Sequence, residues 1–206
     1  MRKKSEIKKE AQDIYDKFGL TIPLSVASVA RFLNIEVSLL DGKSLFEKAK
    51  ESNPDRIKGK NPSQILGFYD KSNSKFYINS TDQPITRQKF TIAHEIGHCV
   101  LHPTDGSNDF RMVVLSEDIY TFENGNDPIK EKEIEANYFA AYLLMPDKEI
   151  IKRLKFIELW RGGELAIRKL AELFGVSSEA MRIRLKTFKT ENPDIWLIQG
   201  LNEKLF

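Results

Sequence analysis

Cysteine and histidine are scarce in this chain of 206 residues, which narrows the chemistry open to it. The single cysteine, Cys99, excludes an internal disulfide and suits a reducing compartment. The three histidines, His94, His98 and His102, follow one another at intervals of four residues. Any metal site that uses imidazole must therefore be built on this short segment.

Long apolar runs are also absent, so the sequence predicts no membrane-spanning helix. The basic start, Met1 to Lys4, is not followed by an apolar stretch of the length that a secretory signal needs. No internal repeat or low-complexity segment interrupts the chain. We therefore expect a cytoplasmic protein with one core and at most a small appendage.

A strong excess of either charge is missing, because the formal net charge is only +2. This excludes a whole-molecule electrostatic binder of nucleic acid, and direct nucleic-acid binding is not expected. The charge is unevenly placed: residues 105–135 carry nine acidic and three basic side chains, and residues 152–189 carry ten basic and four acidic ones. The acidic tract could attract a basic protein substrate, although such tracts are more often solvated surface.

The sequence does contain His94-Glu95-Ile96-Gly97-His98, a His-Glu-x-x-His motif. On a helix, two imidazoles four residues apart lie on one face and can bind one metal ion, while the glutamate between them can activate water. The uncharged flanks and the apolar residues at helical spacing, such as Phe90, Ala93 and Leu101, predict that helix. Pro84 suits its start and Pro103 its end.

A hydrolytic zinc site needs a third protein ligand. His102 lies about 12 Å from His94 along a continuous helix, too far to share one ion. Cys99 points about 100° away from His98 and is better interpreted as a small buried hydrophobe. The third ligand should therefore be a carboxylate from elsewhere in the chain.

The carboxylate candidates lie on a second predicted helix, which runs from residue 131 to Pro146. Glu133 shares a stripe with Asn137 and Ala140, so a ligand would be followed by an amide able to orient a histidine and by a small residue that allows close approach. We favour Glu133 on this pattern, with Glu135 as the main rival. An acidic first turn matched to the helix dipole is the simpler alternative.

Together, the two segments resemble the ImmA/IrrE metallopeptidases. The resemblance rests on residues 87–98 with Leu101 and His102, and on Glu133, Ala136, Asn137 and the run from Phe139 to Pro146. It extends loosely over residues 65–190. It implies a zincin-like fold, one Zn²⁺ held by His94, His98 and Glu133, and limited cleavage of a DNA-binding repressor, as an anti-repressor in mobile-element or stress regulation. The helix-turn-helix domain or sensor-like domain that some members add is not expected here.

The expected fold class is α+β, mostly helical, with a small three-stranded sheet beside the metal helix. Helices are predicted over residues 3–18, 25–33, 147–157, 164–174 and 177–188, in addition to the two described above. Strands are predicted over residues 35–39, 65–69 and 75–79, and a loop over residues 51–62. We expect a peptidase core over residues 1–146 and a C-terminal helical segment over residues 147–206 packed on it.

Residues 164–188 also resemble a helix-turn-helix, in which Arg182, Arg184 and Lys186 could meet phosphates. Against this, Arg184 occupies a position where the motif usually has an apolar residue. The alternative function is therefore a regulator that binds its repressor partner without cutting it, or that binds DNA through these helices.

The mechanism that we expect is metal-assisted peptide hydrolysis, with Glu95 as the general base and Asn137 hydrogen-bonded to one of the ligand histidines, which it holds in the correct tautomer. An oxyanion donor is also needed. The candidates for transition-state or substrate contacts are Tyr120, Tyr142, His102 and Arg87, and the sequence does not choose among them.

Overall fold

The computed structural model describes residues 1–52, 54–70, 73–81, 83–103, 111–114, 128–154 and 163–198. Its sheet has the strand order β1-β3-β2-β4, with β1 at Glu36–Leu40, β2 at Ile65–Asp70, β3 at Lys75–Asn79 and β4 at Arg111–Val114. β1 pairs parallel with β3, and β2 pairs antiparallel with both β3 and β4. The sheet is therefore mixed, and its edges are β1 and β4.

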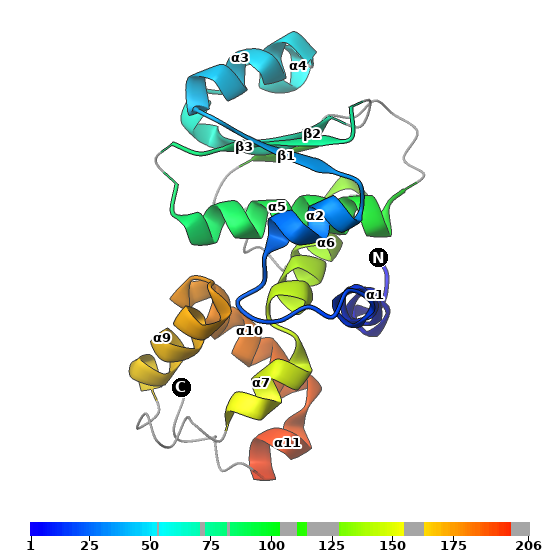
Figure 1. The fold of residues 1–206 in the computed structure, drawn as a ribbon, viewed down its shortest axis with the longest axis vertical. Helices are drawn as coiled ribbons and strands as arrows, with labels where there is room; N and C mark the ends of the chain where they lie inside the picture. Colours follow the sequence, from blue (N-terminus) through cyan, green and yellow to red (C-terminus); the bar gives the residue numbers. More distant parts are fainter. Residues whose placement is uncertain are drawn as a thin grey trace.

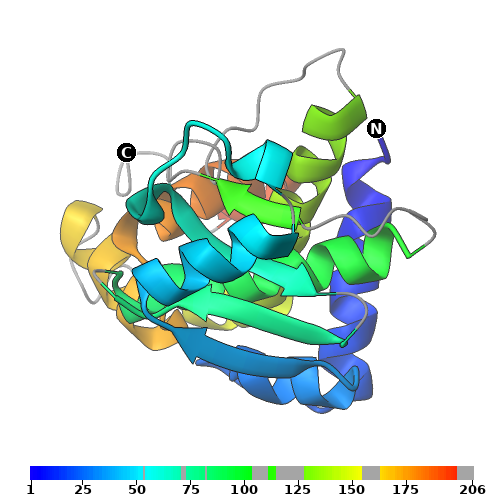
Figure 2. The same cartoon turned by 90° about the horizontal axis from the view of Figure 1, so that it is seen from above.

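Helices cover both faces of the sheet (Figures 1 and 2). The outer face carries α3 (Gly42–Ser52) and the short α4 (Pro54–Ile57), with a small core around Leu45 and Phe68. The inner face lies on α2 (Val26–Phe32) and α5 (Ile85–Leu101). The long helix α5, which contains the His-Glu-x-x-His motif, is thus fixed between the sheet and the helices beyond it.

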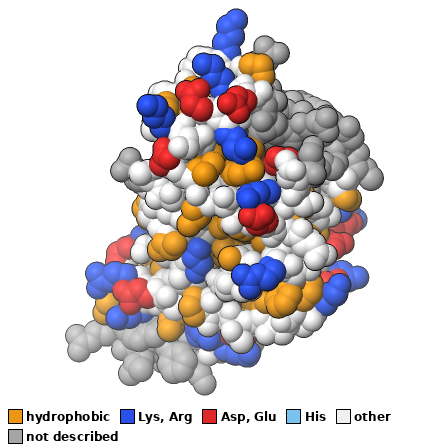
Figure 3. All heavy atoms as spheres, turned by 45° about the horizontal axis from the view of Figure 1, so that its top comes forward, with side chains coloured by type: hydrophobic (Ala, Val, Ile, Leu, Met, Phe, Trp, Pro, Cys, Tyr) orange, Lys and Arg blue, Asp and Glu red, His pale blue; other side chains and the backbone are white. Residues whose placement is uncertain are grey.

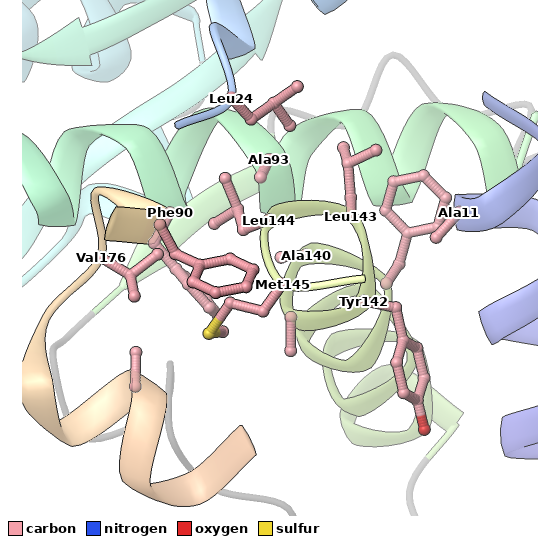
Figure 4. Packing of buried hydrophobic residues seen from close by; sticks show 14 of the residues in the cluster. Ala11, Leu24, Phe90, Ala93, Ala140, Tyr142, Leu143, Leu144, Met145 and Val176 are labelled. Atoms are coloured by element: carbon pink, nitrogen blue, oxygen red, sulfur yellow. The ribbon is translucent and has the colours of Figure 1, made fainter. Parts of the chain in front are cut away.

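The helix α6 (Pro128–Leu144) crosses α5 on the side away from the sheet, and α1 (Lys4–Lys17) packs beside α6 (Figure 1). Phe90 and Ala93 of α5 face Ala140 and Leu144 of α6 in the main core (Figure 4). Gly97 permits the closest approach, since an added Cβ would lie 3.2 Å from the Cα and carbonyl oxygen of Ala136. Small residues at the crossing bring the two helices that carry the candidate ligands into direct contact.

Beyond α6 lie α7 (Asp147–Leu154), α9 (Gly163–Phe174), α10 (Ser178–Glu191) and α11 (Pro193–Ile198) (Figure 1). Arg184 of α10 is only 1% exposed. Its Nε donates to the carbonyl of Met145, 3.1 Å away, and its guanidinium pairs with Asp147. Arg184 therefore fixes α10 to the segment between α6 and α7, and the expectation that it could contact phosphate is wrong.

The predicted fold class is confirmed: the chain is α+β and mostly helical, with a small sheet beside the metal helix. The three predicted strands are present within a residue or so, and β4 extends the sheet beyond them. The prediction of a loop over residues 51–62 is corrected, because the end of α3, all of α4 and the turn Pro62–Gln64 fall within it. Both α3 and α11 were missed.

The face in Figure 3 carries Lys and Arg side chains interleaved with Asp and Glu, as the small net charge implies. Among the side chains coloured there, no large area has one sign. None of the described helices is both long enough and apolar enough to cross a membrane.

Candidate metal centre

His94 and His98 lie on one stripe of α5 and are almost fully buried, at 2% and 3% exposure. Their Nε2 atoms are 3.0 Å apart. The four-residue spacing places one ring above the other on the helix, and the packing of α6 against α5 keeps both rings out of water. The pair therefore presents two imidazole nitrogens to one point in space.

Glu133 of α6 completes the cluster. Its Oε2 lies 3.0 Å from Nε2 of His94 and 3.3 Å from Nε2 of His98. Within the part of the chain that the structure describes, these three residues are the group whose candidate ligand atoms converge, all within 4.8 Å of one another. The Glu133 side chain is 39% exposed, so the cluster is buried on the α5 side and open on the other. An open side is what a catalytic metal site requires.

The donor atoms fit a tetrahedral zinc ion. Zinc bonds of about 2.0–2.1 Å place neighbouring ligand atoms about 3.3 Å apart, close to the three separations of 3.0–3.3 Å. Nδ1 of His94 lies 2.8 Å from Oδ1 of Asn137. If Nδ1–H donates to that amide oxygen, the lone pair is on Nε2, toward the cluster. Lone pairs and a carboxylate this close repel one another unless protons or a cation lie between them.

The pKa values of these side chains depend on one another. Burial lowers the pKa of His94, but the hydrogen bond and negative charge of Glu133 outweigh burial and raise that pKa above its ordinary value. Burial raises the pKa of Glu133, but the two histidines outweigh it and hold that pKa well below the usual range. Glu133 is thus ionised at neutral pH, and a metal would compete with a proton on the histidines.

Glu95 follows His94 on α5 and is fully buried. Its negative charge is near enough to raise the pKa of His94. A buried carboxylate next to a metal centre is a suitable acceptor for a proton from water. The structure thus places the predicted base next to the ligand cluster.

Glu135 turns away from the cluster. Its Oε1 accepts from the backbone N–H of Arg2 at 2.5 Å, and its Oε2 lies 3.6 Å from Nε2 of His102. Arg2 also donates to the carbonyl of Leu101, 2.6 Å away. Arg2 therefore ties the end of α5 to α6, close to the ligands. Sequence analysis missed Arg2 because its partners are 99 and 133 residues away and no local pattern marks it.

The candidates for transition-state or substrate contacts lie in different parts of the structure. The hydroxyl of Tyr142 donates to Glu191 of α10, and its ring points away from α5 (Figure 4). His102 lies against the ring of His98, with centroids 5.6 Å apart, and faces Glu135. Arg87 lines a cavity at the start of α5. Tyr120 lies outside the described residues.

Comparison with known proteins gives consistent matches. The sequence model of the IrrE N-terminal-like domain, a peptidase family, matches residues 56–186, more than half of the chain. An uncharacterized immunity region protein 2 of Bacillus phage phi105 is 30% identical over 124 residues, which are 59% of this chain and 66% of that protein. The radiation response metalloprotease IrrE of Deinococcus radiodurans is 33% identical over 132 residues, 64% of this chain and 36% of that protein. The chain thus spans just under two thirds of one relative and about a third of the other.

Proposed function

The chain belongs to the ImmA/IrrE metallopeptidase family, and on that premise we propose that it is a zinc-dependent endopeptidase that makes limited cuts in a DNA-binding repressor and so relieves repression. The observation that carries the proposal is the convergence of His94, His98 and Glu133 beside the buried Glu95. The zincin-like α+β fold supplies the helix crossing that brings them together.

Each residue has a distinct part in the proposed reaction. His94, His98 and Glu133 would hold the ion, and Asn137 keeps the His94 ring in the orientation that binding needs. Zinc would supply Lewis acidity that activates water and polarises the scissile carbonyl. Glu95 takes the proton from the attacking water and returns it to the leaving amine. A purely structural zinc site would not require a buried carboxylate at this position.

Three considerations support a repressor as the substrate. One relative is named for a radiation response and the other for a phage immunity region. The resemblance to ImmA/IrrE proteins implies one defined cut rather than general digestion. The acidic tract of residues 105–135, which lies largely outside the described residues, would favour a basic protein such as a DNA-binding repressor.

The alternative of DNA binding through residues 164–188 is weakened by side-chain use within the fold. Arg184 is buried on Asp147, and Arg182 pairs with Glu164 of α9 and with Glu179. Lys89 of α5 donates to the carbonyl of Gly175, 3.2 Å away in the turn between α9 and α10. The helical pair is thus tied to the metal helix, which suits a packing role.

The test is to incubate zinc-loaded protein with the helix-turn-helix repressor encoded beside its gene, with casein in parallel. We expect one or two discrete repressor fragments and little cleavage of casein, and Glu95→Gln is the matched inactive control. A repressor that stays intact in a stable complex would favour the non-catalytic regulator. Rapid digestion of casein would contradict a limited endopeptidase.

A further inference from the structure

A cavity of about 400 Å³ opens where the sheet meets the first turn of the metal helix. β1 and β3 are parallel, so the residues that follow them come together at one end of the sheet. Asp41, Gly42 and Lys43 line the cavity after β1, and Thr81 and Gln83 line it after β3. Arg87 closes it from α5.

Among the described residues, the lining of the cavity has two basic side chains and one carboxylate, and it has unsatisfied hydrogen-bonding groups. Neither the Arg87 guanidinium nor the Lys43 ammonium contacts a carboxylate among the described residues. The carboxylate among the described lining residues, Asp41, already accepts from the backbone N–H groups of Lys43 and Ser44, each at 3.0 Å. The starts of α3 and α5 add positive potential from their helix dipoles. The site therefore favours an anion.

Gln83 gives a second, independent indication of a ligand. Both polar atoms of its side-chain amide are buried, and within the described part of the chain neither has a hydrogen-bond partner. An amide buried in this way costs free energy unless something bonds to it. A bound group that carries both charge and hydrogen-bonding capacity would satisfy Gln83 and Arg87 together.

One residue of the cavity wall shares a stripe of α5 with a candidate metal ligand. Arg87 precedes His94 by seven residues, nearly two helical turns, so both lie on the same stripe of α5 about 10 Å apart along the axis. An extended peptide advances about 3.3 Å per residue, so about three residues span that distance. A chain bound at the ligand cluster could thus place one side chain in the cavity.

We propose that this cavity is a specificity pocket for an acidic side chain of the substrate, about three residues from the scissile bond on one side. This inference rests on the proposed endopeptidase function and adds a substrate preference to it. Arg87 pairs with the substrate carboxylate, Lys43 adds charge at the mouth, and Gln83 bonds to the bound group.

Binding can be tested without any cleavage. ¹⁵N-labelled protein is titrated with Nα-acetyl-glutamate amide, its neutral Nα-acetyl-glutamine analogue and inorganic phosphate. We expect the acidic ligand to shift the backbone amide signals of Gly42, Thr81 and Arg87. The dissociation constant of the glutamine analogue should be higher than that of the acidic ligand, by up to about fivefold, which is the ratio expected when a half-exposed ion pair is lost. Arg87→Gln should remove the difference, whereas Arg31→Gln, an exposed site on α2, should preserve it.

The results of this titration distinguish a carboxylate ligand from a phosphate ligand. An acidic ligand that moves none of these signals would overturn the proposal. Strong shifts with phosphate and none with the carboxylate would assign the cavity to a small phosphorylated molecule, which also overturns it.

Cleavage profiling connects the pocket to the reaction. A defined library of proteome-derived peptides is digested with the wild type, Arg87→Gln and Arg31→Gln, and the cut sites are sequenced. We expect Asp and Glu to be enriched about three residues from the cut in the wild type and Arg31→Gln, and the enrichment to vanish in Arg87→Gln. Cuts without an acidic preference would refute the pocket. No cuts in this library or in the cognate repressor would contradict the proposed function instead, and the titration would still decide the pocket.

Discussion

Two glutamates only two residues apart on α6 have different environments. Glu133 faces His94 and His98, whereas Glu135 is bound by Arg2 and lies near His102. Two residues on a helix correspond to about 200° of rotation, so the two carboxylates cannot reach one metal ion. The sequence pattern favoured Glu133 but left Glu135 as a rival, because the pattern alone does not set the rotation of α6 against α5.

Metal binding should therefore distinguish the two positions. The purified protein should hold about one zinc per chain, as expected for a single site. Glu133→Ala should weaken zinc binding by on the order of a hundredfold or more, since it removes a ligand, and Glu135→Ala should leave it nearly unchanged. Competition with a chromophoric chelator measures both affinities. The opposite order would place the ligand on the other face of α6.

Catalysis should separate from binding at Glu95. Glu95→Gln retains the shape of the side chain but removes the proton acceptor, so zinc content should stay the same while the rate of repressor cleavage falls by on the order of a hundredfold or more. Metal analysis and single-turnover cleavage give the two readouts. Cleavage at the wild-type rate would show that another group serves as the base.

At the scale of single residues, the sequence predicts how side chains within about one helical turn lie relative to one another. The relation of His94, Glu95 and His98 follows from helix geometry alone. The bridge from Arg2 to Leu101 and Glu135 does not, because it depends on how α1 packs beside α6. The same limit explains Tyr142, whose hydroxyl is bound by a residue 49 positions later.

At the scale of elements, α5 and α6 could be predicted because apolar spacing and flanking prolines mark them. α3 carried readable signals as well: Asp41 caps its first turn, and Leu45 and Ala49 are buried four residues apart. The polar stretch that follows, rich in Asn, Pro, Gly and Lys, predicted a loop over residues 51–62, although the end of α3 and all of α4 lie within it. The close approach of α6 to α5 was predicted from the small residues of α6, but the point of contact at Gly97 was not, since it depends on which small residues of the two helices meet.

The crossing can be tested at Gly97. In Gly97→Ala the added Cβ would lie 3.2 Å from the Ala136 backbone and 3.0 Å from the Phe139 ring. Both contacts are too short, so α6 must shift by a few tenths of an ångström. Overpacking of this kind costs about 1–3 kcal/mol, against a gain of about 1 kcal/mol in helix propensity. We expect zinc affinity to fall, because the shift moves Glu133 relative to the histidines. Chelator competition and thermal unfolding measure the two effects.

The contrary result for Gly97→Ala is equally specific. A higher melting temperature with unchanged zinc affinity would show that the α6 backbone yields without moving the ligand. The close approach would then serve packing alone.

At the scale of the whole molecule, one charged cluster joins distant parts of the chain. Asp147, at the start of α7, pairs with the buried Arg184 of α10 and with Lys8 of α1, 2.6 Å away. Lys8 also contacts Glu191, 2.7 Å away, near the end of α10. The cluster thus links the N-terminal helix to the C-terminal helices. No sequence pattern could predict it, because its members come from three separate segments.

This cluster predicts a pH-dependent stability. Burial raises the pKa of Asp147, but Arg184 and Lys8 outweigh burial and hold that pKa below its ordinary value. A lowered folded-state pKa adds stability above the unfolded value of about 3.9, and that stability is lost as the pH falls through the folded value. Asp147→Asn should therefore reduce the free energy of unfolding by about 3 kcal/mol at pH 7, since it leaves Arg184 buried without its counter-charge.

The difference between the wild type and Asp147→Asn should begin to shrink below about pH 4, where the carboxyl is protonated in the unfolded state, and should shrink further as the pH falls through the lowered folded-state pKa. Urea unfolding at a series of pH values measures it. Asp16→Asn is the matched control, because Asp16 pairs with Lys148 at the surface and its loss should change stability by less than about 0.5 kcal/mol. If Asp147→Asn were equally destabilising at pH 7 and pH 3, the loss would arise from packing, and charge would not be what joins α1 to α7 and α10.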